Sequence, residues 1–328
     1  VKLINNKKRN KFLNVTNFLL KNHNVLDHTQ KIIKNYRRIH GPLAIIIESM
    51  GAGGAQQVLS RLINHWCLRG DDLLLITFNK KKEYFKLSKN LKRVVLNCSI
   101  PSKNTVHKII LNLYRVFLIR RAIKENQYKK IISFITTTNI LTLISSFGLN
   151  KKVIVCERND IVQQKSLSLT NILRYILYKK SWKITTNTIK AKFILKRYLK
   201  ISNIFYFPNL LRIKPKIIKK MSPSRDFFLA IGRLVPQKNF EFLIKSFSKS
   251  NMKNVDLLII GEGKEKEKLK KLINDLNVGH KVKLLGNVKN PYPFYNKAKG
   301  LIMVSNYEGS PNVLWEALSC GLPCIISD

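Results

Sequence analysis

The chain has 328 residues, of which 45% are hydrophobic, with only 14 glycines and 10 prolines. This length favours two domains, and this composition excludes a disordered, collagen-like or fibrous protein. A total of 61 Lys and Arg against 18 Asp and Glu gives a formal net charge of +43, which favours anionic partners.

The basic residues are spread over nearly every segment of the chain. They do not gather with aromatic residues in a nucleic-acid-binding motif, so no specific nucleic-acid partner is expected. Two interpretations of the charge stay open. One is a basic face that lies on anionic lipid, and the other is a composition rich in Lys, Ile and Asn that no partner has selected.

Five cysteines are an odd number, and their spacing is not that of a metal site. We therefore expect buried, reduced thiols and no bound metal. The N-terminus carries no secretory signal, which favours a cytoplasmic protein. The chain begins with Val1 and ends directly after an apolar run at Asp328, so we expect a fragment of a longer protein.

The longest uncharged run covers residues 131–150, enough for one membrane-spanning helix. Three threonines and an asparagine at 136–139 interrupt this run. The pattern predicts a strand at 131–135, a polar loop at 136–139 and a helix at 140–149.

The chain opens with a basic, Asn-rich N-terminal arm, residues 1–42, that we cannot assign to a core. An apolar run at 43–50, a Gly loop and an amphipathic helix at 55–66 follow. This order begins a parallel βαβ unit. Further strands are expected at 73–78, 93–97, 131–135, 153–156 and 183–186, with a basic helix that ends near residue 128.

The segment 206–226 holds three prolines within dense charge and is predicted to link two domains, 43–205 and 227–328. In the second domain, strands are expected at 227–231, 255–260, 281–286, 300–305 and 323–327, and helices at 239–250, 264–276 and 312–320. Strands that alternate with helices predict two Rossmann-like domains, with a ligand cleft at the carboxyl ends of their parallel strands.

Two segments of the second domain carry candidate binding residues. In YEGSPNVLWEALSCGLP, Glu308 lies in a loop and Glu316 lies eight positions later in a helix, whose free N-terminal NH groups suit anionic or hydroxyl-rich ligands. In IGRLVPQKNFEFLIKSF, Arg233 directly follows a glycine and Lys238 comes just before a helical pattern. Either pair could also simply face solvent, but the surrounding Gly, Pro and helical pattern favours a role in ligand binding.

EGSPNVLWEALSCGLP resembles the Glu-x7-Glu signature of the family-4 glycosyltransferases, and the other segment resembles their Gly-Arg-x5-Lys segment. The resemblance spans residues 43–328. It implies an α/β protein of the GT-B fold, with two facing Rossmann-like domains and parallel sheets, the second of them truncated.

The resemblance also implies the roles of single residues. Arg233 and Lys238 would hold the donor diphosphate, Glu316 the donor ribose, and Glu308 would be the catalytic residue beside the donor sugar. Backbone contacts to the sugar and phosphate are expected from Gly53, Gly54, Gly309, Ser310, Asn312, Val313 and Leu314. No cofactor is expected, because the nucleotide diphosphate sugar is a substrate; a UDP-sugar is favoured over a GDP-sugar.

The segment VIVCERND resembles a bacterial subgroup that builds capsule, exopolysaccharide and lipid-linked glycans. Many relatives carry a His in the N-domain cleft, where this chain has Glu157 and Arg158. These two residues are candidates for contacts to the acceptor. They could equally pair with each other, and the two interpretations stay open.

We therefore expect a retaining glycosyltransferase that moves a hexose or N-acetylhexosamine to a glycan or polyprenyl-linked glycan acceptor in cell-surface polysaccharide synthesis. The alternatives are a nucleotide-sugar 2-epimerase of the same fold, and an inactive truncated remnant or basic binding protein. The helix near 107–124 mixes basic and apolar residues, which suits an anionic membrane surface. The expected location is cytoplasmic, peripheral on the inner face of the cell membrane.

Overall fold

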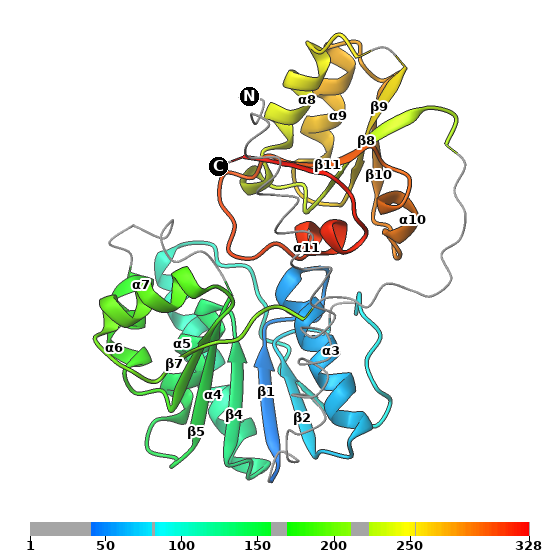
Figure 1. Ribbon diagram of the computed structural model, residues 1–328. Coiled ribbons are helices and arrows are strands. Elements are labelled where there is room, and N and C mark those ends of the chain that lie inside the picture. The colour runs from blue at the N-terminus through cyan, green and yellow to red at the C-terminus, as the bar shows by residue number, and fades with distance from the viewer. Residues whose placement is uncertain (1–40, 81–82, 159–168, 211–222, 253, 328) are drawn as a thin grey trace. The chain divides into compact units, whose positions relative to one another are not determined.

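The computed structural model describes residues 41–80, 83–158, 169–210, 223–252 and 254–327. The predicted arm at 1–42 lies almost entirely outside these residues. Within them, the strands form two sheets in which every paired neighbour runs parallel (Figure 1). The predicted α/β class with parallel sheets is confirmed.

The first sheet has seven strands in the order β3-β2-β1-β4-β5-β6-β7. Its strands are β1 (Leu43–Ile47), β2 (Leu73–Thr77), β3 (Lys92–Val95), β4 (Lys130–Phe134), β5 (Lys152–Glu157), β6 (Lys183–Thr186) and β7 (Ile204–Tyr206). The central strands β1 and β2 are buried along their whole length, as their unbroken apolar sequences predict for a sheet covered on both faces.

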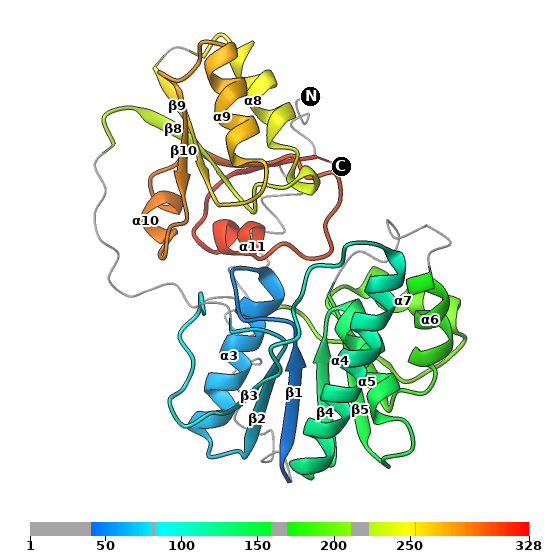
Figure 2. The same cartoon turned by 180° about the vertical axis from the view of Figure 1, so that it is seen from behind.

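Five helices connect these strands. They are α3 (Gly54–Leu68), α4 (Thr105–Glu125), α5 (Thr136–Ser146), α6 (Leu169–Tyr178) and α7 (Ile189–Leu199). Side chains fix two of their starts, because Asn104 accepts from the amide of His107 and Thr188 accepts from that of Ala191. Helices α4 and α5 pack side by side over the sheet (Figure 2).

The second sheet has the order β10-β9-β8-β11-β12. Its strands are β8 (Asp226–Ile231), β9 (Val255–Ile260), β10 (Val282–Gly286), β11 (Gly300–Met303) and β12 (Cys324–Ile326). Alternate residues of β9 point to opposite faces: Leu257 and Ile259 pack in one core with α8 (Phe240–Ser248) and α9 (Lys266–Asp275). Leu258 and Ile260 pack in the other core with α10 (Tyr292–Tyr295) and α11 (Asn312–Ser319).

Both sheets reverse their strand order once, between β1 and β4 in the first and between β8 and β11 in the second. The loops that leave two such strands run to opposite sides of the sheet, which opens a crevice at the carboxyl ends of the strands. The Gly loop follows β1, Arg233 follows β8 and Glu308 follows β11. The topology therefore places these predicted site residues at the crevices.

Three local predictions need correction. The polar loop expected at 136–139 is wrong, because these residues form the first turn of α5, directly after Ile135, which makes the sharp turn with φ 76°. The sequence pattern missed α6, α7, α10 and β7. Only Cys98 and Cys156 are buried; the other three cysteines are half-buried, at the end of a helix or on the edge strand β12.

None of the helices in the described parts of the chain combines the length and the apolar character needed to cross a bilayer.

Candidate functional site

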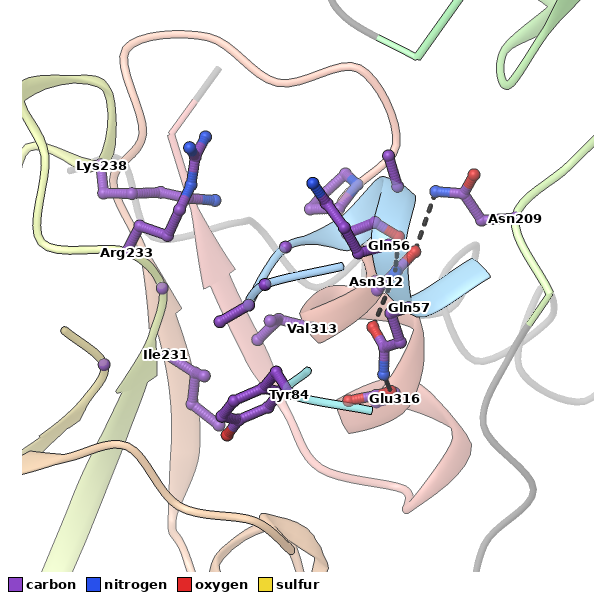
Figure 3. Close-up of a pocket in the computed structure, with 18 of the residues that line it drawn as sticks. Gln56, Gln57, Tyr84, Asn209, Ile231, Arg233, Lys238, Asn312, Val313 and Glu316 are labelled. Atoms are coloured by element: carbon purple, nitrogen blue, oxygen red, sulfur yellow. Dashed lines mark hydrogen bonds between the residues drawn. The ribbon is translucent and has the colours of Figure 1, made fainter. Parts of the chain in front are cut away.

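A pocket of about 920 Å³ lies at the carboxyl ends of the strands (Figure 3). The loops after β1, β4, β5, β8, β9 and β11 all contribute to its wall. The predicted residues that line it are Gly53, Gly54, Arg158, Arg233, Lys238, Glu308, Gly309, Ser310, Asn312, Val313 and Glu316. Glu157 and Leu314 are not among the lining residues.

The loop after β8 brings two cations to this pocket. Arg233 comes directly after Gly232, and Lys238 ends a short 3-10 helix, Pro236–Lys238, before α8. This loop packs tightly against the next one: a Cβ on Gly261, where φ is 151°, would lie 1.8 Å from the carbonyl oxygen of Gly232. Glycine is therefore required at this close approach.

Glu308 lies in the loop between β11 and α11. Its carboxylate forms an ion pair with Nζ of Lys238, and both side chains are largely buried. The ion pair holds the two predicted functional residues side by side, although 70 positions separate them in the sequence.

Glu316, on α11, has a buried carboxylate, with only 4% of the residue exposed. Oε1 accepts a 2.8 Å hydrogen bond from Nε2 of Gln57, and Arg61 lies 3.5 Å away. Oε2 accepts a 3.2 Å hydrogen bond from the hydroxyl of Tyr295. Burial, followed by the nearby Glu316 carboxylate, raises the pKa of Tyr295, so this hydroxyl stays a donor.

A chain of hydrogen bonds joins Glu316 to the Gly loop and to the segment after β7 (Figure 3). The amide of Asn312 donates to Oε1 of Gln57 at 2.7 Å and to the carbonyl oxygen of Gly54 at 3.2 Å. The amide of Asn209 donates to Oδ1 of Asn312 at 2.9 Å. In Figure 3, Arg233 and Lys238 lie across the pocket from this chain.

The carboxylate of Glu157 is buried at the end of β5. It accepts hydrogen bonds from Oγ1 of Thr136 at 3.0 Å, from the hydroxyl of Tyr178 at 2.8 Å and from the backbone NH of Arg158 at 3.2 Å. These groups all donate, which is the pattern an ionised carboxylate requires.

The guanidinium of Arg158 reaches the pocket wall. Nη1 donates to the carbonyl oxygen of Phe207 at 2.9 Å and to Oδ1 of Asn209 at 3.2 Å. The cation also lies 5.7 Å from the ring centre of Phe134 and 5.5 Å from that of Phe207. Burial lowers the pKa of Arg158, but an arginine starts so high that it stays charged at neutral pH.

Residues 214–328 match the family model described as glycosyl transferases group 1. These residues form a glycosyl transferase group 1 domain. It contains Arg233, Lys238, Glu308 and Glu316, which are the residues that carried the predicted resemblance.

Most of the chain is also similar to a glycosyltransferase. It is 28% identical over 283 residues to GalNAc-alpha-(1->4)-GalNAc-alpha-(1->3)-diNAcBac-PP-undecaprenol alpha-1,4-N-acetyl-D-galactosaminyltransferase from Campylobacter jejuni, covering 84% of this chain and 76% of that protein. The predicted enzyme class is confirmed by this relative and by the group 1 domain.

Solved structures share the fold. Sucrose-phosphate synthase from Thermosynechococcus elongatus has a TM-score of 0.73 at 16% identity, covering 88% of this chain and 81% of that one. HepE from Anabaena, in complex with UDP-glucose, has a TM-score of 0.65 at 16% identity, covering 88% and 80%. The predicted GT-B fold is confirmed.

Sequence patterns predicted Gly53, Gly54 and Arg158 but missed other pocket residues that precede the glycosyl transferase group 1 domain. These are chiefly Gln57, Tyr84, Asn187 and Asn209. Each is a single polar or aromatic residue without a motif around it. The one usable signal is position, because Asn187 and Asn209 follow the carboxyl ends of β6 and β7.

Proposed function

We propose that the protein is a retaining glycosyltransferase that moves a hexose or N-acetylhexosamine from a UDP-sugar to a glycan or polyprenyl-linked glycan acceptor. The observation that carries this proposal is the ion pair of Lys238 and Glu308, beside Arg233, at the carboxyl ends of β8 and β11. UDP-glucose in HepE supports the donor class, and the name of the Campylobacter relative supports a polyprenyl-linked acceptor.

In this proposal the donor diphosphate binds Arg233 and Lys238, where a guanidinium and an ammonium meet its negative charge. The ion pair then places Glu308 next to the donor sugar, because a phosphate bound by Lys238 has the Glu308 carboxylate beside it. Backbone groups of Gly53, Gly54, Gly309, Ser310, Asn312 and Val313, which all line the pocket, complete the donor contacts. Both cations become more important as the diphosphate leaves and gains charge.

Transfer breaks the bond between the anomeric carbon and the β-phosphate oxygen and forms a bond from that carbon to the acceptor hydroxyl oxygen. The hydroxyl proton passes to the leaving phosphate, which is on the same face as the attack, so configuration is retained. Glu308 stabilises the positive charge that develops on the sugar ring. No step requires a protein nucleophile.

Glu316 is the proposed ligand of the donor ribose. Its carboxylate already accepts from Gln57 and Tyr295, so two ribose hydroxyls would replace the Gln57 hydrogen bond while the buried Tyr295 contact stays. Such an exchange keeps the buried carboxylate satisfied throughout, which is necessary because an unpaired buried charge is costly.

We further propose a cytoplasmic location on the inner face of the cell membrane, with α4 as the contact. Six apolar residues at helical spacing are exposed on α4: Val106, Ile109, Ile110, Leu113, Tyr114 and Phe117. Basic side chains Lys108, Arg121 and Lys124 lie on the same helix and are exposed. An apolar stripe with flanking cations suits the interface of an anionic bilayer.

The experiment that tests the transfer is an assay of the full chain with UDP-N-acetylgalactosamine or another UDP-hexose and an N-acetylgalactosaminide acceptor. Released UDP measures turnover, and NMR of the product gives its anomeric configuration. We expect Arg233→Ala and Lys238→Ala to weaken UDP binding by about 10- to 100-fold, the usual loss for a hydrogen bond to a charged group. Glu308→Ala should lower mainly the turnover.

Lys245→Ala is the matched control, because Lys245 is a lysine of α8 with an exposed ion pair to Glu241. Its kinetics should equal those of the wild type. Excess EDTA should leave activity unchanged, since protein cations meet the diphosphate charge. Wild-type kinetics in all three site variants, or full and reversible loss of activity in EDTA, would contradict the proposal.

A further inference from the structure

We propose that Arg158 and Asn187 form the subsite for the terminal sugar of the acceptor. The guanidinium donates to one oxygen substituent of that sugar, and the amide oxygen of Asn187 accepts from a neighbouring hydroxyl. This proposal rests on the proposed transfer reaction and assigns its acceptor side. It rests on three observations: a rigid buried cation, an unused amide oxygen and a shared contact with Gly309.

Arg158 is 8% exposed and lines the pocket. Two hydrogen bonds and two aromatic rings hold its guanidinium, and both hydrogen bonds use Nη1. A guanidinium has five NH donors in a fixed plane. Among the described residues, Nε has no hydrogen-bond partner. The guanidinium is therefore held in place and still has NH groups that can donate to a ligand.

Asn187 is 5% exposed and follows β6, next to Arg158 at the end of β5. Its Nδ2 donates to the carbonyl oxygen of Arg158 at 3.4 Å, which fixes the orientation of the amide. Oδ1 has no hydrogen-bond partner among the described residues. Buried polar atoms normally find partners, so an unpartnered donor and an unpartnered acceptor on two neighbouring residues that line the pocket point to a ligand.

Gly309 ties this pair to the donor site. A Cβ on Gly309 would lie 3.4 Å from the carbonyl oxygen of Arg158 and 3.4 Å from Nδ2 of Asn187. Gly309 follows Glu308 directly, and Glu308 is the residue proposed to face the donor sugar. A sugar held by Arg158 and Asn187 therefore lies next to the donor sugar, where an attacking hydroxyl must be.

The charges favour a neutral ligand. The buried carboxylate of Glu157 lies beside Arg158 in the sequence and in space, and it accepts from the Arg158 backbone NH. The charge of this carboxylate attracts the guanidinium and partly offsets it, which lowers the gain from binding a phosphate there. A donor on one residue and an acceptor on its neighbour instead match the hydroxyl or acetamido groups of a sugar, each of which accepts, donates or does both.

Variants of the full chain test the subsite. Arg158→Lys and Asn187→Ala should raise the acceptor KM by about 10- to 100-fold. UDP binding, and hydrolysis of the UDP-sugar without acceptor, should change much less than the acceptor KM. Arg115→Ala is the matched control, because Arg115 also donates to backbone carbonyls of this domain but does not line the pocket. Its acceptor KM should not change.

A binding experiment tests the acceptor subsite without relying on the transfer reaction. Saturation-transfer NMR with methyl N-acetyl-α-galactosaminide and UDP should detect the sugar on the wild type and on Arg115→Ala, but not on Arg158→Lys or Asn187→Ala. Thermal unfolding confirms that each variant is folded. Sugar binding without transfer would support the subsite and contradict the proposed function.

Two results would overturn the subsite. One is an unchanged acceptor KM and sugar signal in both folded variants. The other is competition by inorganic phosphate against the acceptor in the wild type that disappears in Arg158→Lys, because this would make Arg158 an anion site.

Discussion

Glu157 and Arg158 are neighbours in the chain, but their side chains serve different surroundings. The carboxylate of Glu157 belongs to a buried network with Thr136 and Tyr178, whereas the guanidinium of Arg158 reaches the pocket wall. Consecutive residues at a strand end point to opposite sides. One dipeptide can therefore supply both a ligand-binding cation and the carboxylate that offsets its charge.

The network around Glu157 gives a prediction about stability. Tyr178 is fully buried; its hydroxyl donates to Glu157 and accepts from Asn139 at 3.0 Å. Tyr178→Phe leaves both groups without this partner and should lower the free energy of unfolding by about 1–3 kcal/mol. Urea unfolding at neutral pH measures the loss. Tyr198→Phe, which removes an exposed hydroxyl, should change it by less than about 0.5 kcal/mol.

The wild type and Tyr178→Phe should also differ in how their stability depends on pH. Burial, followed by the Glu157 carboxylate, raises the pKa of Tyr178 well above its usual value of 10.0. Above pH 10 the unfolded tyrosine loses its proton while the folded one keeps it, so alkali destabilises the wild type more than it destabilises Tyr178→Phe. The stability advantage of the wild type should shrink by about 1.4 kcal/mol per pH unit there. An advantage that is constant to pH 11 would show that the hydroxyl is not buried.

At the scale of elements, α4 departs from the usual amphipathic helix. Its buried residues are few, Leu111, Ile119, Ala122 and Ile123, and the apolar stripe from Val106 to Phe117 faces away from the core. All three of its arginines already have partners: Arg115 and Arg120 donate to backbone carbonyls of neighbouring loops, and Arg121 forms an ion pair with Glu125. The membrane contact proposed for this helix therefore depends on the apolar stripe more than on these arginines.

We expect the double variant Leu113→Ser, Phe117→Ser to bind vesicles of mixed phosphatidylcholine and phosphatidylglycerol at least about tenfold more weakly than the wild type does. The reason is that each side chain of this size contributes about 1.5–3 kcal/mol when it is buried. Co-sedimentation measures the binding. Both residues are at least 60% exposed, so the fold should tolerate the change. Phe242→Ser, on α8, is the control; equal binding of all three proteins would exclude α4 as the contact.

At the scale of the whole molecule, the charge of +43 acts over a longer range than any single helix. Each Lys or Arg close to an anionic surface adds about 1 kcal/mol of attraction. The Debye length falls from about 10 Å at 0.1 M salt to about 3 Å at 1 M, which screens this attraction but not the insertion of apolar side chains.

Salt should therefore separate the two contributions to membrane binding. Binding to vesicles that contain phosphatidylglycerol should fall steeply between 0.1 M and 1 M salt and should be weak at all salt concentrations on pure phosphatidylcholine. The Leu113→Ser, Phe117→Ser variant should keep the same salt dependence from a lower starting value. Equal binding to both kinds of vesicle at low salt would show that the net charge does not attract the protein to anionic lipid.

The sequence by itself determined the alternation of strands and helices, the two parallel sheets and the local segments around Arg233 and Glu308. These features depend on short-range periodicity and on local signals such as the Gly loop that follows the apolar run at 43–50. The first turn of α5 was mistaken for a loop, because the positive φ of Ile135 that starts it has no signature in an apolar run.

Only the tertiary structure decided which distant side chains share the pocket and which helix face is left open to solvent. Gln57 and Glu316 are 259 positions apart, and Asn187 meets Arg158 because β5 and β6 pair in one register. Hydrogen-bond partners and exposure depend on distances across the fold, which local residue patterns do not contain. The sequence of α4 likewise does not tell whether its apolar residues pack in a core or face a membrane. Only the positions of the neighbouring elements show that they are exposed.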